Sequence, residues 1–193
     1  MYEYIKGELV SLEPTQAVID CSGVGYLLEI TLNTYEALRR AESRETKLYA
    51  HLVVREDAHQ LFGFAEMAER EMFRILIDVN GVGNQTARMM LSSLTVDELR
   101  NAIATQDVKK VQRVKGIGAK TAQRIVMELA DKVGAVGAGA KPSGSADTQA
   151  RDEAMTALTM LGFAKPAVEK LLMNGDWTGM TVEDIIKEGL RKL

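Results

Sequence analysis

Short apolar runs separated by turn residues fill the first third of the chain. The runs are residues 7–12, 17–21, 26–30, 47–54 and 59–64. Turn-forming residues at 22–25 and 55–58 join two pairs of these runs, as is typical of β-hairpins. Roughly five strands within residues 1–64 favour a small closed barrel such as the five-stranded OB-fold.

Apolar positions change to helical spacing at residue 65. The apolar residues that recur at the period of a helix are Met67, Met72, Phe73, Leu76 and Ile77. The helical pattern continues to about Lys132, so we expect a helical domain over residues 65–133.

Two capping signatures mark helix starts. Thr95 is followed three residues later by Glu98, which is a capping box. Asn33 and Glu36 have the same spacing and predict a short helix, capped by Asn33, inside the barrel domain.

A segment rich in Gly, Ala and Ser divides the helical region from the C-terminus. Residues 134–149 have little to bury, and this composition predicts a flexible linker. Helical patterning resumes over residues 150–193, where three short helices would make a marginal independent domain.

The composition excludes several classes of protein. One cysteine and two histidines among 193 residues exclude an internal disulfide framework and argue against a structural zinc site. No apolar run approaches the roughly 20 residues that span a bilayer. The first residues also lack the basic-then-apolar order of a signal peptide. We therefore expect a cytoplasmic protein without a metal or other cofactor.

Charge is distributed unevenly along the chain. The sequence carries 24 Lys and Arg against 27 Asp and Glu, a net charge of −3, which taken alone argues against a nucleic-acid ligand. Residues 1–64 hold 6 basic and 10 acidic side chains, whereas residues 65–133 hold 11 and 9. Residues 108–124 hold six basic side chains and no acidic one. This stretch suits a phosphate ligand, with a merely solvated helical face as the alternative.

A repeat inside the middle region is the most informative feature. Residues 79–87, Val-Asn-Gly-Val-Gly-Asn-Gln-Thr-Ala, align with residues 114–122, Val-Lys-Gly-Ile-Gly-Ala-Lys-Thr-Ala, at an offset of 35 (114 − 79). Glycines let the chain reverse tightly, and backbone amides at a helix start attract an anion. Both copies therefore predict a phosphate contact that ignores base sequence. A plain glycine turn is the alternative, while phosphate-loop and dinucleotide motifs do not fit.

The paired hairpins are similar to tandem helix-hairpin-helix units, which bind DNA backbones. With the barrel, linker and helical C-terminus, the whole chain resembles the RuvA family of bacterial Holliday junction-binding proteins. Residues 5–7 (Ile-Lys-Gly), 23–26 (Gly-Val-Gly-Tyr) and 61–64 (Leu-Phe-Gly-Phe) also resemble that family, and residues 160–163 (Met-Leu-Gly-Phe) resemble ubiquitin-associated domains. The implied fold class is α+β multidomain: an OB-fold barrel, a tandem helix-hairpin-helix domain and a small three-helix C-terminal domain.

The resemblance implies a non-catalytic DNA-binding subunit. It would bind a four-way junction as a homotetramer, singly or as two facing tetramers, and hold the junction open and square-planar. Residues 150–193 would recruit RuvB, a hexameric ATPase motor that drives branch migration, and the RuvC resolvase would be a further partner. The setting would be DNA recombination, DNA repair and the SOS response to DNA damage, with no role at a membrane.

Glu56 and Asp57 lie at the predicted turn of the second hairpin. Acidic residues at turns are commonplace, and a solvated turn is the plain interpretation. The RuvA resemblance instead implies an acidic pin at these two residues, facing the centre of the junction. Carboxylates repel phosphates at that centre, so they would select the structure of the bound DNA rather than add affinity.

The candidate DNA-binding residues come from the two repeats. They are Asn80, Gly81, Val82, Gly83, Gln85, Lys115, Gly116, Ile117, Gly118, Lys120, Thr121 and Arg124. Lys120 and Arg124 are one turn apart and can share a DNA-facing side. The family often carries a lysine where this chain has Asn84-Gln85, and another at Ala119, so ionic affinity would be lower here.

Two other classes of function are open. A repair glycosylase or nuclease would use the hairpins only to position DNA, with Asp131 and Lys132 as its candidate catalytic residues, although no nucleophile–base pair can be singled out. A generic adaptor would use the C-terminal domain, with the barrel in protein contacts. His51 and His59 flank the acidic turn without the further ligands that a metal site needs.

Overall fold

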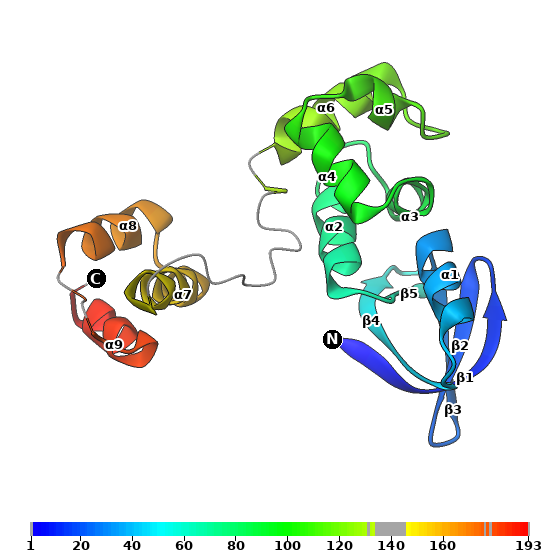
Figure 1. Cartoon of the computed structure of the whole chain (residues 1–193), viewed down its shortest axis with the longest axis horizontal. Helices are drawn as coiled ribbons and strands as arrows, with labels where there is room; N and C mark the ends of the chain where they lie inside the picture. Colours follow the sequence, from blue (N-terminus) through cyan, green and yellow to red (C-terminus); the bar gives the residue numbers. More distant parts are fainter. Residues whose placement is uncertain (1, 131, 134–145, 176, 178, 193) are drawn as a thin grey trace. The chain divides into compact units, whose positions relative to one another are not determined.

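The protein forms two compact units, residues 1–139 and 140–193. This computed structural model describes the chain except residues 1, 131, 134–145, 176, 178 and 193 (Figure 1). Each unit has a hydrophobic core of its own among the described residues, and the two are described separately below.

A closed five-stranded barrel opens the first unit. Its elements are β1 (Tyr4–Glu13), β2 (Gln16–Cys21), β3 (Val24–Ile30), α1 (Leu32–Arg40), β4 (Glu45–Val54) and β5 (His59–Phe64). The strand order is β1-β2-β3-β5-β4, and antiparallel pairing of β1 with β4 closes the barrel. The predicted OB-fold barrel is therefore confirmed. Alternate residues such as Ile19, Leu28 and Leu48 fill its interior, as the period of a strand requires.

The helix α1 begins two residues earlier than the sequence suggested. Its cap is Thr31, whose hydroxyl accepts a hydrogen bond from the Thr34 amide, so the prediction of Asn33 as the cap was wrong. The Asn33 side chain instead donates to the backbone carbonyls of Leu91 and Leu94, at 2.5 and 3.2 Å. The spacing of Asn33 and Glu36 cannot predict that the Asn33 side chain bonds a distant segment instead of capping the helix.

Five helices complete the first unit. They are α2 (Met67–Ile77), α3 (Asn84–Ser93), α4 (Val96–Ala104), α5 (Val108–Gln112) and α6 (Ala119–Leu129). The predicted capping box at Thr95 and Glu98 is confirmed at the start of α4. Apolar side chains from α2 through α6 share one core.

The barrel and the helices of this unit also share that core. The ring of Phe73 on α2 lies 5.0 Å, between centroids, from both Phe62 and Phe64 on β5. The predicted boundary at residue 64 thus separates elements that pack directly together. Because side chains on both sides of the boundary interdigitate, the barrel and the hairpin helices keep a fixed geometry.

The second unit consists of α7 (Ala146–Met160), α8 (Lys165–Asn174) and α9 (Val182–Lys192). Leu158, Val168, Trp177 and Ile185 form its core. Three C-terminal helices were predicted, but α7 begins at Ala146, inside the range 134–149 predicted as linker. Residues 134–145 of that linker lie outside the described part of the chain.

Candidate nucleic-acid interface

The two sequence repeats form two hairpins with the same backbone geometry. Gly81 joins α2 to α3 with φ of +91°, and Gly116 joins α5 to α6 with φ of +86°. In each hairpin the amide of the apolar residue between the glycines donates to the carbonyl three residues earlier, at 3.0 Å for Val82 and 3.2 Å for Ile117. Both apolar side chains are buried, so they anchor the hairpins to the core.

The second glycine of each hairpin caps the following helix. Gly83 precedes α3 and Gly118 precedes α6, and both have extended backbone angles. Neither glycine can supply a side-chain acceptor to the first turn, and a Cβ at either position would meet no other atom within 4 Å. The first-turn amides are therefore accessible from outside, where the helix dipole favours an anion.

The two hairpins lie beside each other in the folded unit. Arg124 on α6 donates from Nη1 to the Asn80 carbonyl oxygen at 3.1 Å. A Cβ built on Gly81 would lie 3.9 Å from the Thr121 hydroxyl oxygen. These contacts bring four predicted site residues together and make one surface of the two repeats.

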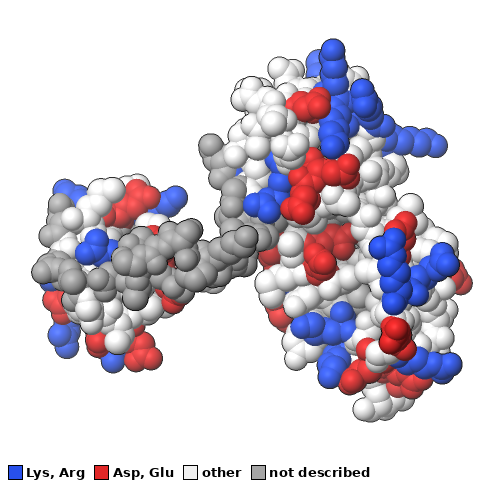
Figure 2. Space-filling view, viewed as in Figure 1, with Lys and Arg blue, Asp and Glu red and all other residues white. Residues whose placement is uncertain are grey.

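The predicted cations differ in what they contact. Lys115 and Lys120 are exposed near the second hairpin. Arg124 already bonds the first hairpin and lies 3.5 Å from Glu128. Figure 2 shows Lys and Arg side chains gathered over α5 and the second hairpin. The surface around the second hairpin is thus more basic than the first, which carries Asn80 and Gln85 at the positions that correspond to Lys115 and Lys120.

The predicted acidic turn projects from the barrel. Glu56 and Asp57 are both exposed between β4 and β5, and the amide of Arg55 closes the turn by donating to the Ala58 carbonyl at 2.9 Å.

His51, near the acidic turn, is half-buried against Phe73, and burial, with a smaller contribution from Arg74, lowers its pKa. Among the described residues, no group of three or more His, Cys, Asp or Glu could hold a metal ion.

Three parts of the chain match known protein families. Residues 1–63 match the RuvA N terminal domain, residues 73–131 the SAM-like helix-hairpin-helix tandem, and residues 149–193 the RuvA C-terminal domain. Relatives named Holliday junction branch migration complex subunit RuvA come from Christiangramia forsetii, Bacteroides thetaiotaomicron and Parabacteroides distasonis. They are 47%, 45% and 48% identical, over 100% of this chain and 100% of each relative. The chain belongs to the RuvA family. The predicted family and fold class are both confirmed.

The RuvA matches divide the candidate residues between two domains. The acidic turn lies inside the part that matches the RuvA N terminal domain, and both hairpins lie inside the helix-hairpin-helix match. Of the residues suggested for an alternative enzymatic role, Asp131 lies outside the described residues, and Lys132 is exposed beyond the end of α6.

Gln85 has a contact that its place in the repeat did not reveal. Its side-chain amide donates to Glu29 Oε2 on β3 at 2.9 Å. Arg88, one turn further along α3, binds the same oxygen at 2.9 Å. Sequence reasoning missed Glu29 and Arg88, because they are separated by more than fifty residues and neither belongs to a motif. Thr86 and Thr121 are both half-buried at the starts of their helices.

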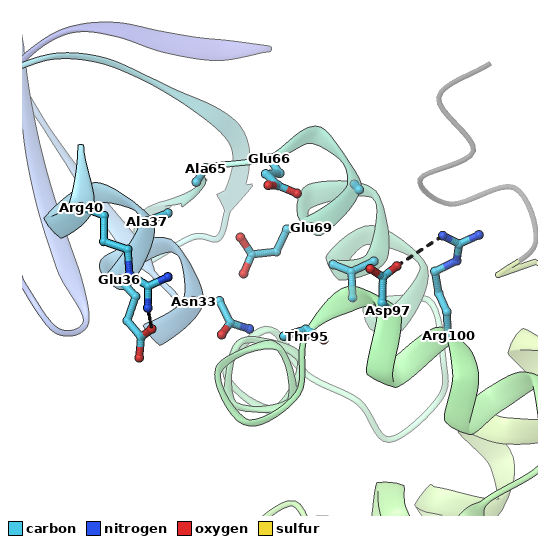
Figure 3. A pocket seen from close by; sticks show the side chains of 12 residues that line it. Asn33, Glu36, Ala37, Arg40, Ala65, Glu66, Glu69, Thr95, Asp97 and Arg100 are labelled. Atoms are coloured by element: carbon cyan, nitrogen blue, oxygen red, sulfur yellow. Dashed lines mark hydrogen bonds and ion pairs between the residues drawn. The ribbon is translucent and has the colours of Figure 1, made fainter. Parts of the chain in front are cut away.

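A polar cleft of about 540 Å³ lies between α1, α2 and α4 (Figure 3). Two ion pairs line it, Glu36 with Arg40 at 2.9 Å and Asp97 with Arg100 at 3.7 Å. Glu69 is buried at this cleft, where both of its oxygens accept hydroxyl hydrogens from threonines. Four of the charged side chains in this cleft are thus paired with one another, and Glu69 is bonded to threonines. In the described part of the chain no helix is long and apolar enough to cross a membrane.

Proposed function

We propose that this chain is the junction-binding subunit of a branch-migration complex, and that it has no catalytic activity of its own. The single observation that carries the proposal is the pair of matched hairpins held side by side in one rigid unit with an exposed acidic turn. The relatives' printed name, Holliday junction branch migration complex subunit, supports the same role.

The hairpins would hold the arms of the junction by their backbones. Gly83 and Gly118 are exposed in the hairpins, and the side chains of Lys115 and Lys120 are exposed beside the second one. Amides and ammonium groups recognise phosphate without reading bases. Binding would therefore depend on salt concentration and on the shape of the DNA rather than on its sequence.

The acidic turn would define the centre of the junction. In a homotetramer, four copies of Glu56 and Asp57 would surround one axis and repel phosphates from it. That repulsion would keep the crossover open and square-planar, and would penalise a continuous duplex that crosses the centre. One tetramer, or two facing each other, would enclose the junction.

The second unit would recruit the partners. Residues 150–193 would bind RuvB, whose ATP hydrolysis drives branch migration, and the assembly would also contact RuvC. Because the two units have separate cores, the second would engage a moving motor while the first stays on DNA. We place this activity in the cytoplasm, in recombination, DNA repair and the SOS response.

A comparison of DNA ligands tests the proposal. In a gel-shift titration at moderate salt, the protein should bind a four-way junction much more tightly than a linear duplex of the same arm sequence. The native mass, measured with and without junction DNA, should correspond to one or two tetramers. Equal affinity for the two DNAs would refute the proposal.

The acidic pin is tested by Glu56→Ala combined with Asp57→Ala. Loss of the central repulsion should raise duplex affinity and lower junction selectivity by about fivefold or more. The control, Glu13→Ala with Glu42→Ala, removes two other exposed barrel carboxylates and changes the net charge equally. If both variants change selectivity alike, the effect is one of net charge and the pin assignment is wrong.

A further inference from the structure

Glu29 connects the strand that follows the acidic turn to the first DNA-binding hairpin. Its Oε1 accepts from the Gln60 amide on β5 at 3.2 Å. Its Oε2 accepts from Gln85 and pairs with Arg88 on α3, each at 2.9 Å. Gln60 lies three residues beyond Asp57, and Gln85 lies two residues beyond Gly83. One carboxylate thus bridges the strand after the acidic turn, which is proposed to repel phosphates, and the helix after the first hairpin, which is proposed to bind them.

The bridge is partly buried and charge-assisted. The side chain of Glu29 is 19% exposed and that of Arg88 is 21% exposed. Arg88 Nη1 also donates to the Thr15 carbonyl in the turn between β1 and β2, at 3.3 Å. Partly buried, charge-assisted hydrogen bonds are shorter and stronger than exposed ones, so this bridge resists movement of α3 on the barrel.

The opposite end of α3 is held independently. Asn33 on α1 donates to the carbonyls of Leu91 and Leu94, and the Leu32 amide donates to the Ser92 hydroxyl at 3.1 Å. At the N-terminal end of α3, the buried side chains of Val82 and Ala87 anchor the hairpin to the helical core. Glu29 adds a polar contact that ties this end of the helix to the barrel.

We propose that Glu29 is a positioning residue that fixes the first hairpin relative to the acidic turn and thereby contributes to selection of four-way junctions over linear duplex. The inference rests on the proposed function. A linear duplex needs only contacts with the hairpins, whereas a junction must meet the hairpins and the acidic turn at one fixed separation. Loosening that separation weakens the junction complex and leaves simple duplex binding intact. Gln85, on this view, serves to dock the hairpin on the barrel rather than to bind phosphate.

The test compares the full-length wild-type protein with Glu29→Gln in fluorescence anisotropy titrations of a labelled junction and a labelled linear duplex. Glu29→Gln keeps the shape of the side chain but removes its charge, and junction affinity should fall about fivefold with duplex affinity changed less than about twofold. The matched control is Glu36→Gln, which removes an exposed carboxylate from a surface pair with Arg40 and alters the net charge equally. The control should leave the ratio of affinities unchanged.

A double variant tests whether Glu29 acts through Arg88. Arg88→Gln should reproduce the loss of selectivity, and Glu29→Gln with Arg88→Gln should be no worse than either alone, because both act through one contact. Equal weakening of junction and duplex binding, additive effects, or an unchanged ratio in Glu29→Gln would overturn the inference. A wild-type protein without junction preference would instead overturn the proposed function. If Glu29→Gln loses its far-ultraviolet circular dichroism, Gln60→Leu, which removes only the β5 contact, replaces it under the same criteria.

Discussion

Glu69 illustrates how a single buried carboxylate makes stability depend on pH. Both of its oxygens accept hydroxyl hydrogens, from Thr31 at 2.5 Å and Thr34 at 2.7 Å. Burial raises the pKa of Glu69, the two hydrogen bonds oppose that rise, and the nearby Glu66 adds to it. The net effect is a raised pKa, so the folded protein holds the proton more tightly than the unfolded chain does.

The direction of this shift gives a testable pH dependence. A raised carboxyl pKa contributes stability that is fully present below the unfolded value of 4.5 and is lost as the pH rises through the folded value. Glu69→Gln cannot titrate, so the wild type should lose stability relative to this variant as the pH rises from 4.5 through the raised pKa of Glu69. Urea unfolding at several pH values measures the difference. Parallel stability curves for the two proteins would contradict the shift, and exposed Glu42→Gln serves as the control.

Residue identity alone could not have predicted these side-chain contacts. Thr31 and Asn33 are equally suitable caps by type, and the choice between them depends on Asn33 finding acceptors some sixty residues away. Gln85 similarly occupied a repeat position that suggested DNA, until the fold brought Glu29 next to it. Such contacts depend on packing between distant segments, which no local pattern encodes.

At the scale of elements, periodicity and repetition in the sequence were sufficient to predict the barrel and the two hairpins. The alternation of strands and their hairpin turns predicted the barrel, because a closed sheet must bury one face of every strand. The offset repeat predicted two hairpins with the same backbone, and Gly81 and Gly116 differ by only a few degrees in φ. The contact of Arg124 with the Asn80 carbonyl was not predictable, since it depends on how α6 packs against the first hairpin.

Substituting alanine for each of the two glycines of a hairpin should have different effects on stability and on junction affinity. Gly118 has an ordinary φ of −78° and open space around it, so the weaker capping by alanine is offset by its lower unfolded-state entropy, and Gly118→Ala should change stability by less than about 1 kcal/mol. The new methyl group would, however, stand where a phosphate must approach the amides. Loss of one such charge-assisted hydrogen bond should weaken junction binding about tenfold. Anisotropy and thermal unfolding of the same sample separate the two effects, and Gly83→Ala should behave alike.

Gly116→Ala should instead destabilise the fold. Its left-handed φ of +86° costs an alanine about 1–2 kcal/mol, although no atom lies within 4 Å of the added Cβ. Gly23→Ala, at φ of +91° in the barrel turn between β2 and β3, is the control for strain away from DNA. It should lose similar stability and keep junction affinity. A Gly118→Ala protein with full junction affinity would mean that the amides do not face phosphate.

At the scale of the whole molecule, the two units have separate cores and should unfold separately. The chain has a single tryptophan, Trp177, and it is buried in the core of the second unit, where its indole donates to the Leu172 carbonyl at 3.0 Å. Tryptophan fluorescence therefore reports on the second unit alone. Far-ultraviolet circular dichroism is dominated by the larger first unit.

Junction DNA should stabilise only one of the two transitions. The small second unit buries a modest core, so the fluorescence transition should come at lower urea than the main loss of circular dichroism. A ligand at about 100 times its dissociation constant stabilises the unit that binds it by about 2.7 kcal/mol. Saturating junction DNA should therefore move the circular-dichroism transition to higher urea and leave the Trp177 transition in place. If DNA shifts both transitions equally, the second unit takes part in junction binding, which is the result expected of an adaptor that uses its C-terminal domain.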